Sequence, residues 1–265
     1  FRNMVKATIN NFESLALSGK TLGNLTYSTR KSVGKRSDTD TAVVNINGSL
    51  DTLNIEPQAG FDFGMKSKTP LKLVNGKLLA TEARSNGRSA IVQGIQGSLL
   101  PLSDPATDEF SEDDYDMVFV TGKDNKPVGR VRSKDAFDSH DLELFDTEAI
   151  LKRDYRGQLQ RDPDTGETTT TGYSLDFTQT KKGDDEIGHL IRIILSKNEF
   201  ERLRPNLKAY GKYVPQGLKL SFVGNETTNW TIYADTLVAL DEKATEKSAQ
   251  NQSKATTNQT DKAKG

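Results

Sequence analysis

The chain has 265 residues, a net charge of −1 and no cysteine, and its mean hydropathy is −0.64. This composition excludes disulfides and thiolate chemistry, and no apolar run approaches the roughly 18 residues of a membrane-spanning helix. The charge is uneven, because residues 1–100 carry a net +6 and residues 101–140 a net −5. We expect a cytoplasmic protein with a basic first unit beside an acidic connector.

The first unit, residues 1–101, contains short strand-like segments such as "TAVVNI" at 41–46. Such alternating, β-branched segments, separated by turns about every ten residues, are typical of small barrels and sandwiches. A short helix is expected near the start, in "NNFESLAL". "LSGKT" at 17–21 resembles the end of a phosphate-binding loop, but Ser14 stands where that motif requires glycine. We therefore interpret it as a turn.

Residues 102–140 are predicted to be an acidic linker followed by a β-hairpin. "LSDPATDEFSEDDYD", Leu102 to Asp116, holds seven acidic residues and no basic one, which is typical of a solvated linker. "MVFVTGKDNKPVGRVR" alternates around turn-forming residues and predicts the hairpin.

The second unit, residues 141–240, repeats the same kinds of element in the same order. The offset is about 138 residues at Ile55 and Ile193, and about 147 at Leu71 and Leu218, where "PLKLVNG" matches "GLKLSFVGN". A helix is predicted in "SKNEFERLR", with Ser196 as N-cap and Pro205 after its end. Residues 241–265 contain no aromatic residue, valine, isoleucine or leucine, so we expect a disordered tail. The sequence therefore predicts a mainly β protein of two tandem barrel-like modules with one or two short helices.

No arrangement of residues predicts catalysis. The two histidines, His140 and His189, have no companion at metal-ligand spacing, and "DPDTGE" at 162–167 is a hairpin turn more readily than a calcium loop. We therefore predict a protein that is not an enzyme and has no cofactor or metal.

Basic residues instead form clusters that could bind nucleic acid. The last cluster interleaves basic residues with tyrosines, a pattern that can follow phosphates and stack bases on single strands. An ordinary solvated face with partly buried tyrosines is the alternative. The predicted nucleic-acid-binding residues are Arg30, Lys31, Lys35, Arg36, Lys66, Lys68, Lys152, Arg153, Arg156, Arg202, Arg204, Lys208, Tyr210, Lys212 and Tyr213.

The ordered segments "HLIRIILSKNEF", "GLKLSFVGN" and "NWTIYADTLV" resemble a small domain family of unassigned function carried on Gram-positive integrative and conjugative elements. That family includes the helicase processivity factor. The resemblance covers residues 145–240 and, more weakly, 20–100. It implies oligonucleotide-binding-like barrels that act with a helicase and relaxase on DNA. Most members have one domain, whereas this chain shows two.

The leading hypothesis is a non-enzymatic accessory factor of conjugative or plasmid DNA transfer and replication, which binds single-stranded DNA, a helicase, or both. The alternatives are a protein–protein scaffold without DNA contact and a β-rich phage structural protein.

Overall fold

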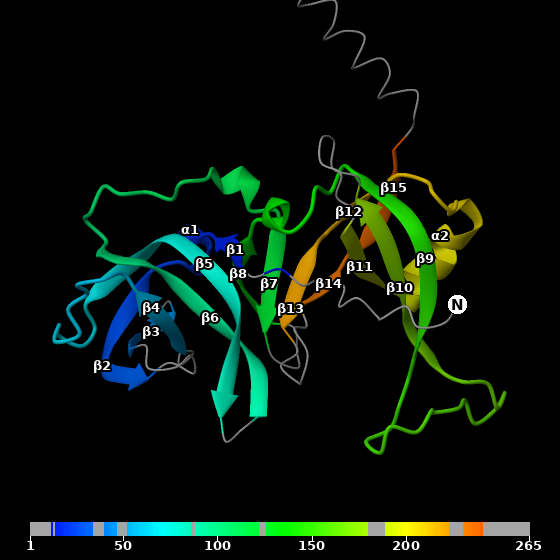
Figure 1. Cartoon of the computed structure of the whole chain (residues 1–265), viewed down its shortest axis with the longest axis horizontal. Coiled ribbons are helices and arrows are strands. Elements are labelled where there is room, and N and C mark those ends of the chain that lie inside the picture. The colour runs from blue at the N-terminus through cyan, green and yellow to red at the C-terminus, as the bar shows by residue number, and fades with distance from the viewer. Residues whose placement is uncertain are drawn as a thin grey trace, which may run out of the picture.

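The computed structural model describes residues 12, 14–33, 40–46, 52–85, 88–121, 126–179, 189–222 and 230–240. It is mainly β, with two barrel-like halves joined by a central hairpin (Figure 1). The predicted tail, residues 241–265, lies outside the described residues. Within the described residues, no helix is long and apolar enough to cross a membrane.

The first barrel contains five strands: β2 (Leu25–Val33), β3 (Asp40–Ile46), β4 (Thr52–Pro57), β5 (Pro70–Ser85) and β6 (Arg88–Pro101). Strands β2, β3 and β4 form an antiparallel meander, β4 pairs in parallel with β6, and β6 pairs with β5. Pairing of β5 with β2 closes the barrel. This order is that of the oligonucleotide-binding fold, a five-stranded Greek-key barrel. Inward residues such as Leu25, Val44 and Ile55 are fully buried.

The second barrel is built from β9 (Leu142–Leu151), β10 (Thr170–Gln179), β11 (His189–Ser196) and a kinked hairpin. One arm of the hairpin is β12 (Tyr213–Gln216) with β13 (Lys219–Phe222), and the other is β14 (Trp230–Tyr233) with β15 (Thr236–Ala239). Both halves of the hairpin share one antiparallel register. The kink falls at Gly217, whose φ of 64° favours glycine.

The two barrels have the same strand order. In the second barrel β9, β10 and β11 form the meander, β14 pairs in parallel with β11, and a bridge from Glu143 to Lys212 closes the ring. Ile55 and Ile193 occupy equivalent places, because each pairs in parallel with an isoleucine of its barrel's last strand. The same order of strand types is what an internal repeat predicts.

The predicted equivalence of Leu71 and Leu218 is wrong. Leu71 pairs with the first strand of its barrel, whereas in the second barrel Lys212 holds that position. Leu218 comes six residues after Lys212, so it lies that much further along the chain than the position equivalent to Leu71. The two "LKL" motifs have the same residues but lie at different positions in equivalent strands of the two barrels. An alternating pattern fits any part of a strand, so it does not fix the position.

A hairpin joins the barrels into one sheet. It consists of β7 (Met117–Thr121) and β8 (Lys126–Val131), as the sequence predicts. Strand β7 pairs in parallel with β13 of the second barrel, and β8 contacts β1 (Ser14–Leu17), which pairs with β5 of the first. All strands but β12 and β15 therefore form one 13-stranded sheet within the described residues.

The acidic segment, residues 102–116, differs from the expected solvated linker. It runs over the first barrel as a strap, which we name the acidic strap (Figure 1). The Lys72 ammonium donates to the main-chain oxygens of Asp104 and Ala106, and the Asp108 carboxylate accepts from Gly19 N at 3.2 Å and Asn75 N at 2.7 Å. The segment carries no basic residue of its own, but the barrel beneath it supplies the donors.

The strap also has a buried anchor at its end. Tyr115 follows a short 3-10 helix, Glu112–Asp114, and is 1% exposed. Burial, together with the nearby carboxylates of Asp108 and Glu112, raises the pKa of Tyr115 to about 12. Tyr115 is therefore uncharged at neutral pH, and its buried ring fixes the end of the strap to the rest of the protein.

Of the two predicted helices, one is present. Ser196 caps α2 (Lys197–Leu203) by accepting from Glu199 N at 3.3 Å, and the helix ends just before Pro205. The expected helix in "NNFESLAL" is instead β1 from Ser14 onward, because its residues extend the sheet beside β5. A single turn of helix, α1 (Gly19–Leu22), follows it.

Candidate nucleic-acid interface

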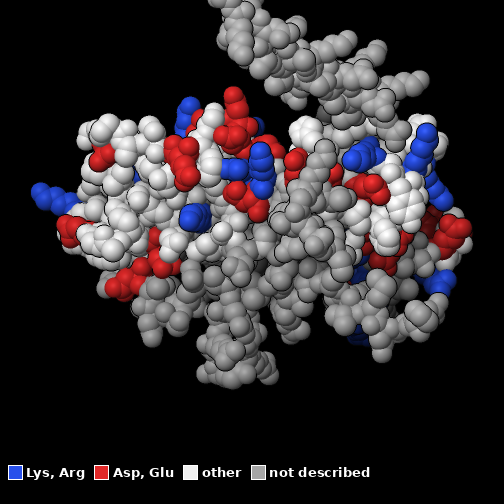
Figure 2. Space-filling model, turned by 45° about the horizontal axis from the view of Figure 1, so that its top comes forward, with Lys and Arg blue, Asp and Glu red and all other residues white. Residues whose placement is uncertain are grey.

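The predicted basic clusters are divided between the two barrels. Lys66 and Lys68 lie between β4 and β5 of the first barrel, whereas the remaining described clusters belong to the second barrel. Arg30 and Lys31 lie in β2, and their side chains are outside the described part. Lys35 and Arg36 lie outside the described residues. Red and blue side chains are interspersed on the face that Figure 2 shows.

Lys152, Arg153 and Arg156 lie in the connection between β9 and β10, which corresponds to the loop between strands 1 and 2 of an oligonucleotide-binding barrel. Residues 152–169 extend from the barrel at the lower right of Figure 1. Loops of this kind, with the loop between strands 4 and 5 and the face of strands 2 and 3, bind oligonucleotides in that fold.

The connection contains two tight turns, one closed by a hydrogen bond from Asp154 N to Gln158 O and the other by one from Asp162 N to Glu167 O, both at 2.8 Å. In the first, the Asp154 carboxylate accepts from the main-chain N–H groups of Arg156 and Gln158, both at 2.8 Å. Gly157 takes a φ of 80°, and the Arg153 guanidinium donates to its carbonyl at 2.8 Å. The turn is thus held by its own side chains.

The second turn repeats this construction. The Asp162 carboxylate accepts from Asp164 N and Thr165 N at 2.9 Å, and these backbone bonds lower the pKa of Asp162. The Arg161 guanidinium donates to the carbonyl of Gly166 at 3.1 Å. The predicted hairpin turn is confirmed, and Asp162 is the carboxylate that organises it.

The first turn presents an aromatic ring to solvent. Tyr155 is 89% exposed, and the Arg156 guanidinium lies 5.1 Å from its ring centroid. Residues 152–161 carry four basic side chains and one acidic one, whereas residues 162–167 carry three acidic and no basic ones. Positive charge is therefore concentrated at the turn that also presents the ring, whereas the second turn is mainly acidic.

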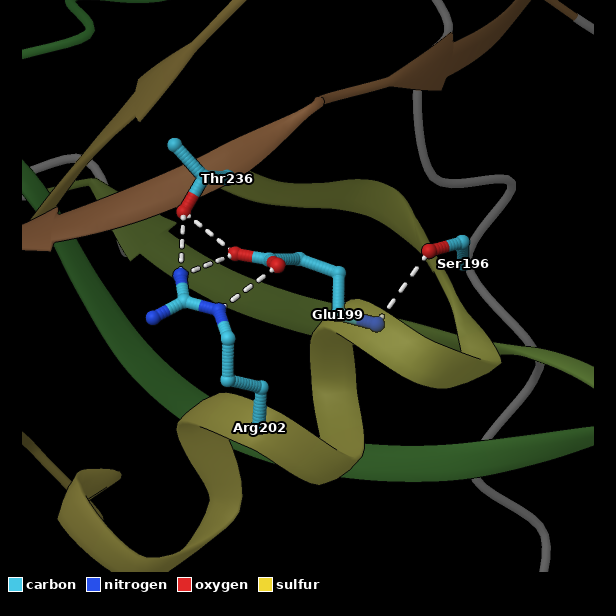
Figure 3. A network of polar contacts seen from close by, with 4 residues as sticks. All are labelled: Ser196, Glu199, Arg202 and Thr236. Carbon is cyan, nitrogen blue, oxygen red and sulfur yellow. Dashed lines mark hydrogen bonds and ion pairs between the residues drawn. The ribbon is translucent and has the colours of Figure 1, made fainter.

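The cluster after β11 is largely engaged in holding α2 and its loop. Glu199 accepts from Arg202 in a bidentate pair, at 2.6 and 2.9 Å, and from the Thr236 hydroxyl at 2.5 Å (Figure 3). These bonds to Arg202 and then Thr236 lower the pKa of Glu199 to about 2. The Lys212 ammonium lies 3.7 Å from Asp141. Arg202 and Glu199 thus bind α2 to Thr236 of β15, and Lys212 is paired with Asp141 just before β9.

The stacking role predicted for Tyr213 is wrong. Its ring is 5% exposed, and its hydroxyl accepts from Lys208 N at 2.8 Å. The ring fills the barrel interior because Tyr213 begins β12 and alternates inward. Tyr210 remains available, since it is 66% exposed, and it meets Phe145 edge to face at 6.5 Å. Arg204 and Lys208 are exposed in the same loop.

Sequence reasoning missed Tyr155 and Arg161. The signal for Tyr155 was present in "KRDYRG", where an aromatic residue stands between basic ones. Strand β9 ends at Leu151, so the basic residues occupy the exposed turn after it.

Comparisons with known proteins are distant. No protein-family model matches the chain, and no protein with curated annotation matches its sequence. A solved structure of fission yeast Pot1 with single-stranded DNA is 11% identical, covers 83% of each chain, and has a TM-score of 0.25. A second structure, described as the molecular basis for abrogation of activation of pro-inflammatory cytokines, is 8% identical, covers 91% of this chain and 98% of that one, and has a TM-score of 0.18.

Proposed function

We propose that the protein is a non-enzymatic accessory factor that binds single-stranded DNA. Its setting would be the cytoplasmic transfer or replication of a conjugative element or plasmid, alongside a helicase or relaxase. The observation that carries this proposal is the exposed Tyr155–Arg156 turn, placed on a barrel with the strand order of the oligonucleotide-binding fold. The setting rests on the family resemblance of the sequence.

The turn suits single strands because it offers both kinds of contact that they require. An exposed ring stacks on a base of any identity, and nearby cations contact the phosphates on either side. The turn's hydrogen bonds are already made, so little ordering is needed on binding. On the face of β10 and β11 Asp176 is paired with Arg192, and β9 adds the carboxylates of Asp146 and Glu148, which repel phosphates. We therefore place the strand on the turn and not across the sheet.

The test is fluorescence anisotropy of a labelled oligothymidine with the intact protein at low and moderate salt. Tyr155→Ala should weaken binding by about 1–3 kcal/mol with little change in salt dependence, and Tyr155→Phe should retain most of the affinity. Arg156→Ala should lower the log–log salt slope by about 0.7, the value for one phosphate contact on a single strand.

The matched control is Tyr210→Ala, which removes an exposed tyrosine at the other end of β9. This control shows whether the DNA binds at the Tyr155–Arg156 turn or at the loop before β12. If only Tyr210→Ala weakens binding, the DNA site lies in that loop instead. Absence of binding at low salt, where attraction is strongest, contradicts the proposal and leaves the protein-scaffold function.

A further inference from the structure

We propose that the free edge of β9 is a docking site for an extended, basic segment of a partner protein, which adds to the sheet as a strand. This site is separate from the proposed DNA-binding turn. Strand β9 ends the 13-stranded sheet. Leu144 exchanges main-chain hydrogen bonds with Tyr210 and Gly211, and beyond Leu144 the strand pairs with β10 alone among the described residues. All residues from 145 to 149 are exposed, although they lie within a regular strand.

The edge offers main-chain groups to a new strand. The N–H of Thr147 donates to the Asp146 side chain at 2.7 Å and not to β10, so it points away from the existing sheet. In an antiparallel ladder these outward groups recur at every second residue, which adds Ala149. An incoming strand would pair with Thr147 and Ala149, as in β-strand addition. It would take the Thr147 N–H from the Asp146 side chain, which frees that carboxylate for a basic residue of the partner.

Charge specifies the chemistry of the partner. Asp146 and Glu148 lie two residues apart and so share one face of the strand, where Asp146 stands opposite Asp176 of β10. Asp176 is neutralised by Arg192, whose two nitrogens reach it at 2.7 Å. Within the described residues neither Asp146 nor Glu148 forms an ion pair. Arg192 is also close enough to be attracted by Asp146 and Glu148, so these three carboxylates share one guanidinium and the face keeps a net negative charge.

A partner strand complementary to this edge carries lysine or arginine at two alternate positions. Its intervening residues face Thr147 and Ala149 and are therefore small or apolar. A second copy fits less well. Pairing centred on Thr147 would place Asp146 of each copy beside Glu148 of the other, and like charges directly opposite destabilise a sheet. Pairing centred on Ala149 leaves both Glu148 side chains opposite Ile150, and only Asp146 would stand opposite a basic residue, Lys152, which lies beyond the end of β9.

The test uses a labelled nine-residue peptide with lysine at every odd position and valine or threonine at every even one. The comparison peptide has the same composition with its lysines grouped at one end. We expect the alternating peptide to bind the intact protein at least about threefold more tightly. On its binding, amide hydrogen exchange at Thr147 and Ala149 should slow.

Two variants separate charge from edge geometry. Asp146→Asn with Glu148→Gln should weaken binding about threefold to tenfold, as expected for two exposed ion pairs. The matched control, Asp164→Asn with Glu167→Gln, makes the same charge change in the second turn and should leave affinity unaltered. Thr147→Pro removes only an outward N–H, which an edge strand tolerates, and should abolish the preference for the alternating peptide.

The fold of each variant is checked by the fluorescence of Trp230, the one tryptophan of the chain. Equal binding of both peptides, or unchanged binding after the Asp146 and Glu148 substitutions, would overturn the proposal even if Thr147→Pro did not fold. Concentration-dependent dimerisation that either edge variant abolishes would show that the occupant is a second copy, and would overturn it too.

Discussion

The continuous sheet predicts that the two barrels unfold together, and Phe119 offers the sharpest test. Phe119 lies in β7, is fully buried, and pairs with Leu220 of the second barrel and with Gly129 of β8. Its side chain belongs to one hydrophobic core that includes residues of both barrels. Removing the ring, as in Phe119→Ala, should cost about 3–5 kcal/mol, because the cavity forms between fixed strands.

The assay is urea-induced unfolding followed by two signals. Trp230, 2% exposed in β14, reports the second barrel, and far-ultraviolet circular dichroism reports both. The two curves should coincide in the parent protein and in Phe119→Ala. With a slope of about 2 kcal/mol per molar urea, the midpoint should fall by about 2 M.

The matched control is Phe145→Ala, which removes a ring that is 47% exposed and should lower the midpoint much less. Separate transitions in the parent protein would refute the reasoning, because they would mean that the hairpin does not transmit stability between the barrels. A shift of the Trp230 curve alone in Phe119→Ala would lead to the same conclusion.

Three further predictions concern the strap, the helix network and Tyr213. Asp108→Ala leaves two main-chain N–H groups without the carboxylate that accepts from them. We expect the parent protein to resist limited proteolysis within residues 102–116 and the variant to be cleaved there faster. Equal cleavage rates would contradict the packed strap. The pKa of Glu199 is lowered from 4.5 to about 2, so its contribution to stability is complete above about pH 4.5 and is lost as the pH falls toward 2. Acid titration of Glu199→Gln should lack that loss, and an unchanged acid profile would contradict it. Tyr213→Phe should lower the free energy of unfolding by about 0.5–1.5 kcal/mol, measured by urea denaturation, and leave DNA affinity unchanged.

The predicted fold is confirmed where periodicity and turns carry it. Alternating segments such as 41–46 and 173–178 form strands that place buried side chains on one face. The capped helix after Ser196 is also confirmed, because its signals are local. The oligonucleotide-binding strand order agrees with the barrel modules that the sequence favoured.

Features that depend on distant contacts could not be predicted from the sequence. The acidic segment has linker composition, and only the barrel's Lys72, Gly19 and Asn75 turn it into a strap. Likewise, nothing local distinguishes the buried Tyr213 from the exposed Tyr155, because their exposure follows from barrel closure and from the length of β9. The clusters of basic residues in the sequence identified the β9–β10 turn. They did not show that Arg153 and Arg161 already donate to main-chain carbonyls of the two turns.

The most direct test of the central proposal is anisotropy of a labelled oligothymidine titrated with the intact protein and with Tyr155→Ala at low salt. The account predicts saturable binding by the parent protein, and an affinity lower by about 1–3 kcal/mol in the variant, while Trp230 fluorescence shows that the fold is intact. Binding that is equal in both proteins, or absent from both, would contradict it.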